Sequence, residues 1–129
     1  MIMLREKQVV KTDKAPKPAG QYSQAVLAGN LVFVAGQVGI DPQTRIAPKG
    51  ITAQTKQCLE NVKAILAASG ATLDGVVRIG VYLRNMDDFA EMNKVFELYF
   101  PEFPPARTTI EAVLASDFLI EIDAIALKL

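Results

Sequence analysis

The sequence predicts an α+β domain in which two helices cover one face of a six-stranded sheet. Three observations support this fold class. Two segments carry apolar residues at helical spacing, six segments have strand character, and their order is β-β-β-α-β-α-β-β. The chain has 129 residues, of which 50% are hydrophobic. A chain of this length buries enough surface to fold alone, so residues 1–129 are expected to form a single domain.

The first three strands are expected before residue 40. A short strand is predicted at residues 7–10, followed by strands at residues 23–28 and 31–38. The last two flank Gly29-Asn30, a dipeptide typical of a two-residue hairpin turn. These segments therefore predict a meander that begins the sheet.

The remaining strands lie in the second half of the chain. Residues 76–84 alternate, with apolar Val77, Ile79, Val81 and Leu83 on one side. Residues 107–114 and 119–127 have the same alternation and are separated by a short segment, residues 115–118. They are therefore predicted to pair with each other as an antiparallel hairpin.

The first helix is predicted at residues 52–69, where apolar side chains fall on one stripe. Thr52 is expected to cap its start, and Gly70 stands where a left-handed residue commonly ends a helix. Cys58, the only cysteine, lies within the stripe and is interpreted as a small core residue.

The second helix is predicted from about Asp87 to Phe100, with an apolar inner face that contains several aromatic residues. Asp88 and Glu91 have the spacing of a capping box at its start. Pro101 is expected to end it, because proline cannot continue a helix.

The last two strands are expected to carry a polar face that points away from the helices. Alternation assigns to it Arg107, Thr109, Glu111, Glu121 and Asp123. A hairpin would bring Glu111 near Glu121 or Asp123, and these carboxylates would repel one another unless a cation compensates. Arg107 is the first candidate for that cation, and Arg78 and Arg84 are further candidates.

Two interpretations of this face remain open. It is either a solvated sheet surface with ordinary charges or a functional site. Apolar residues on the same side of the strands favour an interface between copies of the chain; these are Phe33, Val113, Ile125 and Leu127.

Composition excludes several function classes. Fourteen basic and 14 acidic residues give zero net charge, which argues against a dedicated nucleic-acid-binding protein. The absence of histidine excludes Ser-His-Asp triads and Cys-His dyads. One cysteine permits no intrachain disulfide and too few thiolates for a zinc site, so no metal is expected. No apolar run approaches a signal-peptide core or a membrane span, so a cytoplasmic protein without a membrane partner is expected.

Six stretches of the sequence, in order and spanning nearly the whole chain, resemble the Rid family of reactive intermediate (imine/enamine) deaminases, also called YjgF-type proteins. They are AGQYSQA at 19–25, VAGQ at 34–37, LENVK at 59–63, DFAEMN at 88–93, PART at 105–108 and IEIDAIA at 120–126. The resemblance implies a chorismate-mutase-like subunit with ferredoxin-like β-α-β elements and a mixed sheet. It also implies a homotrimer with three clefts between subunits.

The resemblance further implies a hydrolase of metabolite damage control. Such enzymes deaminate reactive 2-imino acids, and the enamines that tautomerise to them, to 2-keto acids and ammonia. The expected substrates are 2-aminoacrylate/2-iminopropanoate and 2-iminobutanoate, and no cofactor is expected.

The resemblance also assigns roles to individual residues. Arg107 would hold the substrate carboxylate, and Glu121 would orient the attacking water. Tyr22 and Gly36 would line the cleft, and Asn93 would contribute from across the subunit interface. Structural roles are the alternatives: a surface glutamate, a core aromatic, a packed strand glycine and a helix-surface asparagine.

Two positions depart from the family pattern. Thr109 stands where many members have cysteine, and its hydroxyl and backbone N–H are the groups left to contact water or substrate. Ala35 stands where serine is common, which removes one polar contact. These departures bear on substrate range and rate.

Two other function classes remain. A trimer that binds 2-keto acids without turnover, as a sensor or chaperone, would use Arg107 in the same way. An RNA endonuclease or translation inhibitor is the other alternative, with a carboxylate metal site made of Glu111, Glu121 and Asp123. Neutral charge and the absence of histidine weigh against RNA cleavage.

Overall fold

The computed structural model describes residues 7–129 and contains one six-stranded sheet and two α-helices. The short apolar stretch at the N-terminus lies within residues 1–6, outside the described residues. The strands are β1 (Gln8–Val10), β2 (Ala25–Ala28), β3 (Leu31–Val38), β4 (Val76–Leu83), β5 (Ala106–Glu111) and β6 (Ile120–Leu127). The helices are α1 (Ile51–Ala68) and α2 (Phe89–Tyr99), with 3₁₀ turns η1 (Leu73–Gly75) and η2 (Met86–Asp88).

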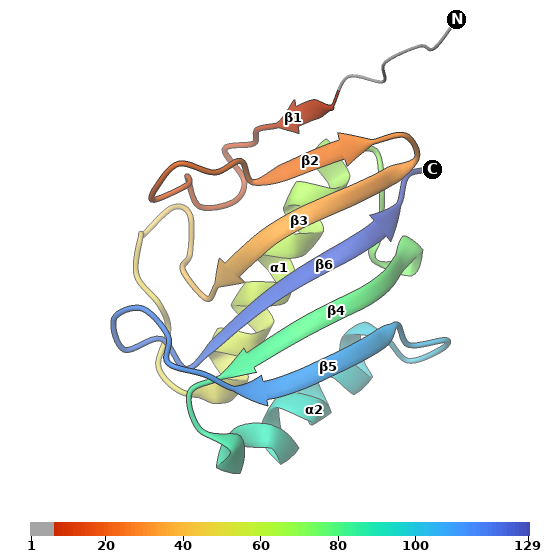
Figure 1. Cartoon of the computed structure of the whole chain (residues 1–129). Helices are drawn as coiled ribbons and strands as arrows, with labels where there is room; N and C mark the ends of the chain where they lie inside the picture. Colours follow the sequence, from red (N-terminus) through yellow and green to blue (C-terminus); the bar gives the residue numbers. More distant parts are fainter. Residues whose placement is uncertain (1–6) are drawn as a thin grey trace, which may run out of the picture.

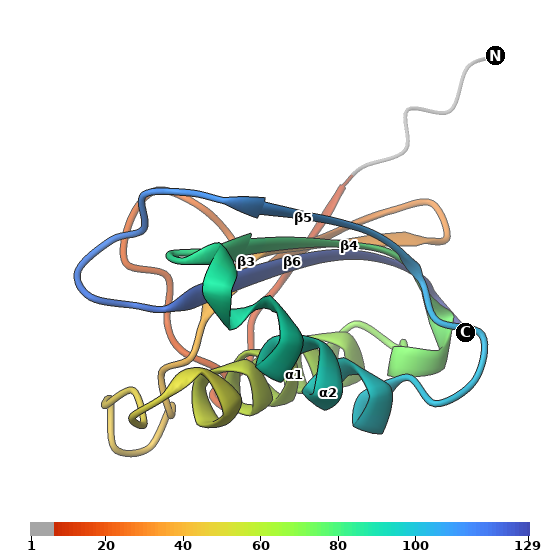
Figure 2. The same cartoon turned by 90° about the horizontal axis from the view of Figure 1, so that it is seen from below.

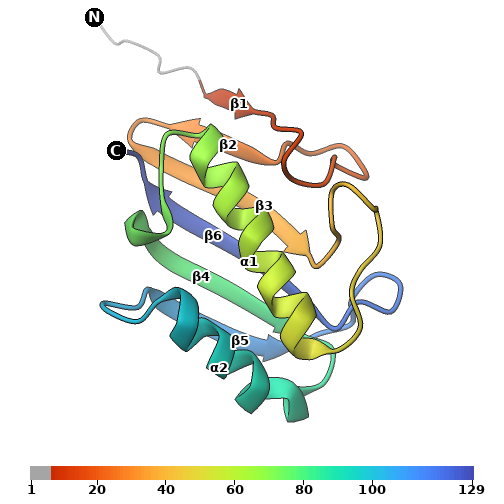
Figure 3. The same ribbon diagram turned by 180° about the vertical axis from the view of Figure 1, so that it is seen from behind.

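Both helices cover the same face of the sheet, as predicted, and no helix formed by residues 7–129 covers the other face (Figure 2). Seen from behind, α1 crosses β3 and β6, whereas α2 lies along the β5 edge (Figure 3). The core between the layers includes Ile79, Leu83, Leu59, Ile120 and Ile122, all fully buried. This α+β arrangement confirms the predicted fold class. Within residues 7–129, neither helix is long and apolar enough to cross a bilayer.

The helices form where predicted, but their N-terminal caps differ. Gly50 precedes α1, and the Thr52 hydroxyl makes no cap, because the helix already begins at Ile51. Asp88 makes no side-chain cap to α2 either. It continues the turn η2, which Asn85 caps by accepting a hydrogen bond from the Asp87 N–H. At the other end of α1, Gly70 has the expected left-handed conformation, with φ of 77°.

The first hairpin is also confirmed. Strands β2 and β3 pair antiparallel across Gly29-Asn30, and Gly29 has a positive φ of 62°. Strand β1 adds to β2 at the edge of the sheet. Cys58 lies in the core as predicted, and its thiol donates to the Ile120 carbonyl at 3.7 Å.

The predicted hairpin between the last two strands is wrong. The strand order is β1-β2-β3-β6-β4-β5, so β6 lies between β3 and β4 and pairs antiparallel with both (Figure 1). Strand β5 pairs only with β4, in parallel, because α2 is a crossover that returns the chain to the same end of the sheet. Since β5 ends at Glu111, the chain has an eight-residue connection, residues 112–119, in which to reach the centre.

This topology separates side chains that were predicted to share one face. In the parallel pair, Ile79 is opposite Arg107 and Val81 is opposite Thr109, and both β4 residues point into the core. Arg107 and Thr109 therefore lie on the helix side of the sheet. Glu121 alternates with buried residues of β6 and lies on the open side. The common polar face predicted from alternation does not exist.

The connection between β5 and β6 is held by one arginine. Arg84, at the end of β4, donates to the carbonyls of Phe118 at 2.7 Å, Ser116 at 2.7 Å and Leu114 at 3.0 Å. Gln54 of α1 accepts a further bond from the Leu119 N–H at 2.9 Å. Arg84 was a candidate partner for carboxylates, but its guanidinium is used by backbone carbonyls instead.

We predict that Arg84→Met lowers the free energy of unfolding by about 2 kcal/mol, because three charge-assisted bonds to the connection are lost. Urea unfolding at a fixed protein concentration measures the loss. Arg78→Met is the matched control: it removes one exposed bond, to the Thr108 hydroxyl, and should cost less than about 0.5 kcal/mol. Equal losses in the two variants would contradict this role for Arg84.

Candidate functional site

The candidate residues form two groups on opposite sides of the sheet. Arg107, Thr109 and Asn93 belong to the helix side, between β5 and α2. Tyr22, Gly36 and Glu121 belong to the other group and line a second cavity. Each group is described below as a half-site: the arginine half-site and the glutamate half-site.

The Arg107 guanidinium rests on aromatic rings of α2. Its central carbon lies 4.9 Å from the centroid of Phe96 and 5.4 Å from that of Phe89, which are cation–π distances. Its Nη1 lies 3.9 Å from the Met92 sulfur. Burial lowers the pKa of Arg107, and within residues 7–129 no carboxylate forms an ion pair with it. Its charge is therefore held in place and available to an anion from outside the chain.

Arg107 opens into a cavity of about 400 Å³. The cavity is lined by Asn93, Phe96, Glu97, Phe100, Pro104, Pro105 and Arg107. Asn93, which is expected to act from across a subunit interface, lines the same cavity as Arg107. Relative to Glu121, both residues are on the other side of the sheet.

Thr109 supplies an unused polar atom further along β5. It is two residues beyond Arg107 on the same face of β5. Its hydroxyl is buried and has no hydrogen-bond partner within residues 7–129. Because an unpaired buried hydroxyl is costly, this oxygen favours a partner from a ligand or a second chain.

Glu121 lies directly over the backbone of β3. A Cβ added to Gly36 would come 2.9 Å from the Glu121 Cδ, so a larger residue there would force this carboxylate to move. Burial, and then the charge of Asp123, raise the pKa of Glu121. A carboxylate with a raised pKa is a better general base than an exposed one.

The glutamate half-site is a cavity of about 200 Å³. Its walls include Tyr22, Gly36, Gln37, Phe118 and Glu121. The Tyr22 ring is half exposed rather than a core aromatic, and its hydroxyl accepts a bond from the Ala19 N–H at 3.1 Å. The cavity is thus walled by aromatic and backbone surface around one carboxylate.

Buried Gln24 fixes the segment that forms one wall of this cavity. Its amide nitrogen donates to the carbonyls of Thr12 and Pro16 at 3.0 and 2.9 Å, and its oxygen accepts from the Thr12 N–H at 2.7 Å. No sequence pattern indicated these bonds of Gln24, or the contacts of Phe89 and Phe96 with Arg107. The spacing of the two phenylalanines on α2 was the available signal, but it did not indicate which strand residue they would contact.

Asp123 is engaged by its neighbours on the open face. It accepts bonds from the Gly80 N–H at 3.1 Å and the Tyr82 hydroxyl at 2.8 Å, and the second bond raises the pKa of Tyr82. Glu111 lies on the other side of the sheet and accepts from the Met86 N–H. The predicted proximity of Glu111 to Glu121 or Asp123 is therefore wrong. Within residues 7–129, these carboxylates form no metal-ligand cluster.

The open face also exposes apolar side chains, among them Phe33 at 41% and Leu127 at 44%. Phe33 lines a hollow of about 350 Å³ together with Arg78, Tyr82 and Asp123. The predicted mixture of charges and apolar residues is therefore present on this side of the sheet. Arg107 is not part of it.

Comparison with known proteins gives extensive matches. The family model described as Endoribonuclease L-PSP matches residues 12–128. A RutC family protein of Pyrococcus horikoshii is 54% identical over 124 residues, 95% of this chain and 98% of that protein. The chloroplastic Reactive Intermediate Deaminase A of Arabidopsis thaliana is 42% identical over 94% of this chain and 66% of its own length.

A solved structure is similar over the same length. RidA from the Antarctic bacterium Psychrobacter sp. has 42% sequence identity and a TM-score of 0.91, and the match covers 93% of this chain and 98% of that one. The similarity therefore includes the strands and helices that carry both half-sites.

We predict that Glu121→Gln is more stable than the wild type at about pH 7. Because the folded-state pKa of Glu121 is raised above 4.5, its stabilising contribution is present below pH 4.5 and is lost as pH rises through the folded value. Glutamine avoids the burial of a charge, so its advantage should disappear below pH 4.5. Urea unfolding at pH 7 and below pH 4.5 measures the difference in stability between the variant and the wild type. A variant less stable than the wild type at pH 7 would contradict a raised pKa for Glu121.

Proposed function

Because this chain belongs to the Rid (YjgF/L-PSP) family, we propose that it is a hydrolase that deaminates reactive 2-imino acids to 2-keto acids and ammonia. The substrates proposed are 2-aminoacrylate/2-iminopropanoate and 2-iminobutanoate. The name of the Arabidopsis relative, a reactive intermediate deaminase, supports this activity.

The observation that carries the proposal is the state of Arg107. A guanidinium stacked on two aromatic rings, in a cavity and without an acidic partner in residues 7–129, is suited to a planar anion. Arginine binds a carboxylate through two parallel hydrogen bonds, which fixes the orientation of the ligand. A 2-imino acid held in this way has its C=N carbon at a defined position.

A complete site on this proposal requires two chains. The sheet stands between Arg107 and Glu121, so one chain does not present both groups to one small molecule. The arginine half-site of one copy would face the glutamate half-site of another, and a homotrimer would contain three such clefts. The exposed apolar side chains of the open face support association.

The reaction then needs little from the protein. Arg107 holds the carboxylate, and the Glu121 carboxylate takes a proton from a water that adds to the iminium carbon. Glu121 returns this proton to the amine nitrogen of the adduct, and the C–N bond breaks. Ammonia leaves with the bonding electrons, while the hydroxyl of the adduct gives its proton to the Glu121 carboxylate and the carbonyl forms. The Thr109 hydroxyl, Tyr22 and Asn93 would position the substrate and water. Each step uses only substrate, water and side chains, so no cofactor is required.

The binding-only alternative uses the same arginine. A sensor or chaperone that holds 2-keto acids would need Arg107 but not a base with a raised pKa. The raised pKa of Glu121 therefore favours an enzyme over a protein that only binds the ligand. The RNA alternative is supported by the family model's name, whereas the carboxylates proposed for its metal are divided between the two sides of the sheet.

We predict that Arg107→Ala and Glu121→Gln each reduce imine consumption by about 100-fold. Arg107→Ala no longer orients the substrate, and Glu121→Gln has no general base to activate water. An amino-acid oxidase generates 2-iminobutanoate in situ, and semicarbazide traps the imine that survives. Glu121→Gln should still bind 2-oxobutanoate, whereas Arg107→Ala should not.

Lys94→Ala is the control, because it removes a cation from the exposed side of α2 and should match the wild type. A wild-type protein that leaves the trapped imine unchanged would contradict the deaminase proposal. Binding of 2-oxobutanoate without imine turnover would support the binding-only alternative.

A further inference from the structure

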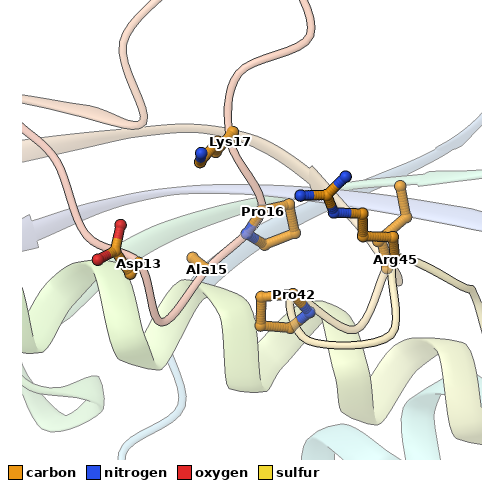
Figure 4. Close-up of a pocket in the computed structure, with 7 residues that line it drawn as sticks. Asp13, Ala15, Pro16, Lys17, Pro42 and Arg45 are labelled. Carbon is orange, nitrogen blue, oxygen red and sulfur yellow. The ribbon is translucent and has the colours of Figure 1, made fainter.

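A further cavity, distinct from those of the two half-sites, adjoins the glutamate half-site and has no role in the function proposed above. It has a volume of about 550 Å³ and lies between residues 13–17 and the loop that follows β3 (Figure 4). Its lining residues are Asp13, Ala15, Pro16, Lys17, Ile40, Pro42 and Arg45. Its floor is apolar, and two of its three charged residues are cations.

Both cations stand on backbone that is held in place. Arg45 has a positive φ of 65°, and its loop is closed by bonds from the Arg45 N–H to the Asp41 carbonyl at 2.8 Å and from the Asp41 N–H to the Ile46 carbonyl at 3.1 Å. Lys17 follows the segment that Gln24 binds. Among residues 7–129, neither cation forms an ion pair with a carboxylate, so both charges are available.

Figure 4 shows how these side chains lie. The Arg45 guanidinium extends from its loop toward Pro16, and the Lys17 ammonium lies on the other side of that ring. Asp13, the one carboxylate of the lining, is at the far end from Arg45. An anion placed over Pro16 would therefore lie between the two cations.

The two cavities share part of their lining. Pro16, Lys17 and Ile40 line both the cavity that contains Glu121 and the cavity that contains Arg45. A ligand in the glutamate half-site that extends past Lys17 would therefore enter the cavity that Arg45 lines. Contact with the apolar floor would suit methylene groups, and the cations would suit a terminal anion.

We propose that Lys17 and Arg45 bind the distal carboxylate of 2-imino dicarboxylic acids, so that dianionic imines are preferred substrates. The inference rests on the function proposed above. Arg107 of one copy holds the 2-carboxylate, the C=N carbon lies over Glu121 of another, and the second carboxylate lies between Lys17 and Arg45 of that copy. The two cations offset the repulsion between a dianion and Glu121.

The test compares imines that differ in the second carboxylate. Oxidases acting on aspartate, glutamate and 2-aminobutanoate generate 2-iminosuccinate, 2-iminoglutarate and 2-iminobutanoate, and semicarbazide competition gives kcat/KM for each. The wild type should prefer at least one dicarboxylate. The double variant Lys17→Met/Arg45→Met should lower kcat/KM for the preferred dicarboxylate about tenfold more than that for 2-iminobutanoate. The single variant Arg45→Met, whose residue lies outside the glutamate half-site, should keep kcat/KM for 2-iminobutanoate within about twofold of the wild type.

Lys14→Met/Lys49→Met is the matched control, because it removes the same charge from exposed positions that do not line the cavity. It should retain the preference for dicarboxylates. Equal losses for dicarboxylate and monocarboxylate imines, or the same loss in the control, would overturn the inference.

The wild-type protein alone separates the two proposals. Consumption of 2-iminobutanoate without a preference for a dicarboxylate would overturn the second-carboxylate site and leave the deaminase proposal standing. Consumption of none of the three imines would overturn the deaminase proposal, and this inference with it.

Discussion

The parallel pairing of β5 with β4 determines where the functional side chains point. It places Arg107 opposite Ile79, a core residue, so the guanidinium is directed toward α2 and rests on Phe96. The antiparallel pairing of β6 with β3 and β4 directs Glu121 to the other side, over Gly36. A single sheet therefore separates a cation from an anion within one chain.

This separation explains the electrostatics of both half-sites. Had Arg107 and Glu121 shared a face, they would form an ion pair, which would neutralise the anion site and lower the pKa of the glutamate. Apart, Arg107 keeps no acidic partner in the described chain, and burial raises the pKa of Glu121. Both groups are thus ready for a ligand, at a cost in the stability of the single chain.

The sequence predicted local structure well and the sheet order poorly. Periodicity located both helices to within about two residues, and Gly29-Asn30 indicated the hairpin. Alternation also identified which residues of β5 share a face. It did not show which face, because the pattern is the same for parallel and antiparallel pairing. The cation–π contacts of Arg107 depend on this choice, so they too were missed.

Subunit mixing tests most directly whether the active site combines two chains. Arg107→Ala and Glu121→Gln chains, each inactive alone, are unfolded together in equal amounts and refolded, with the wild type refolded in parallel. An intact site then forms wherever Arg107 of one variant meets Glu121 of the other. Random assembly predicts recovery of about a quarter of the wild-type imine turnover, because each of the two positions is intact in half of the chains. Activity that stays at the level of the separate variants would contradict a site built from opposite sides of two sheets.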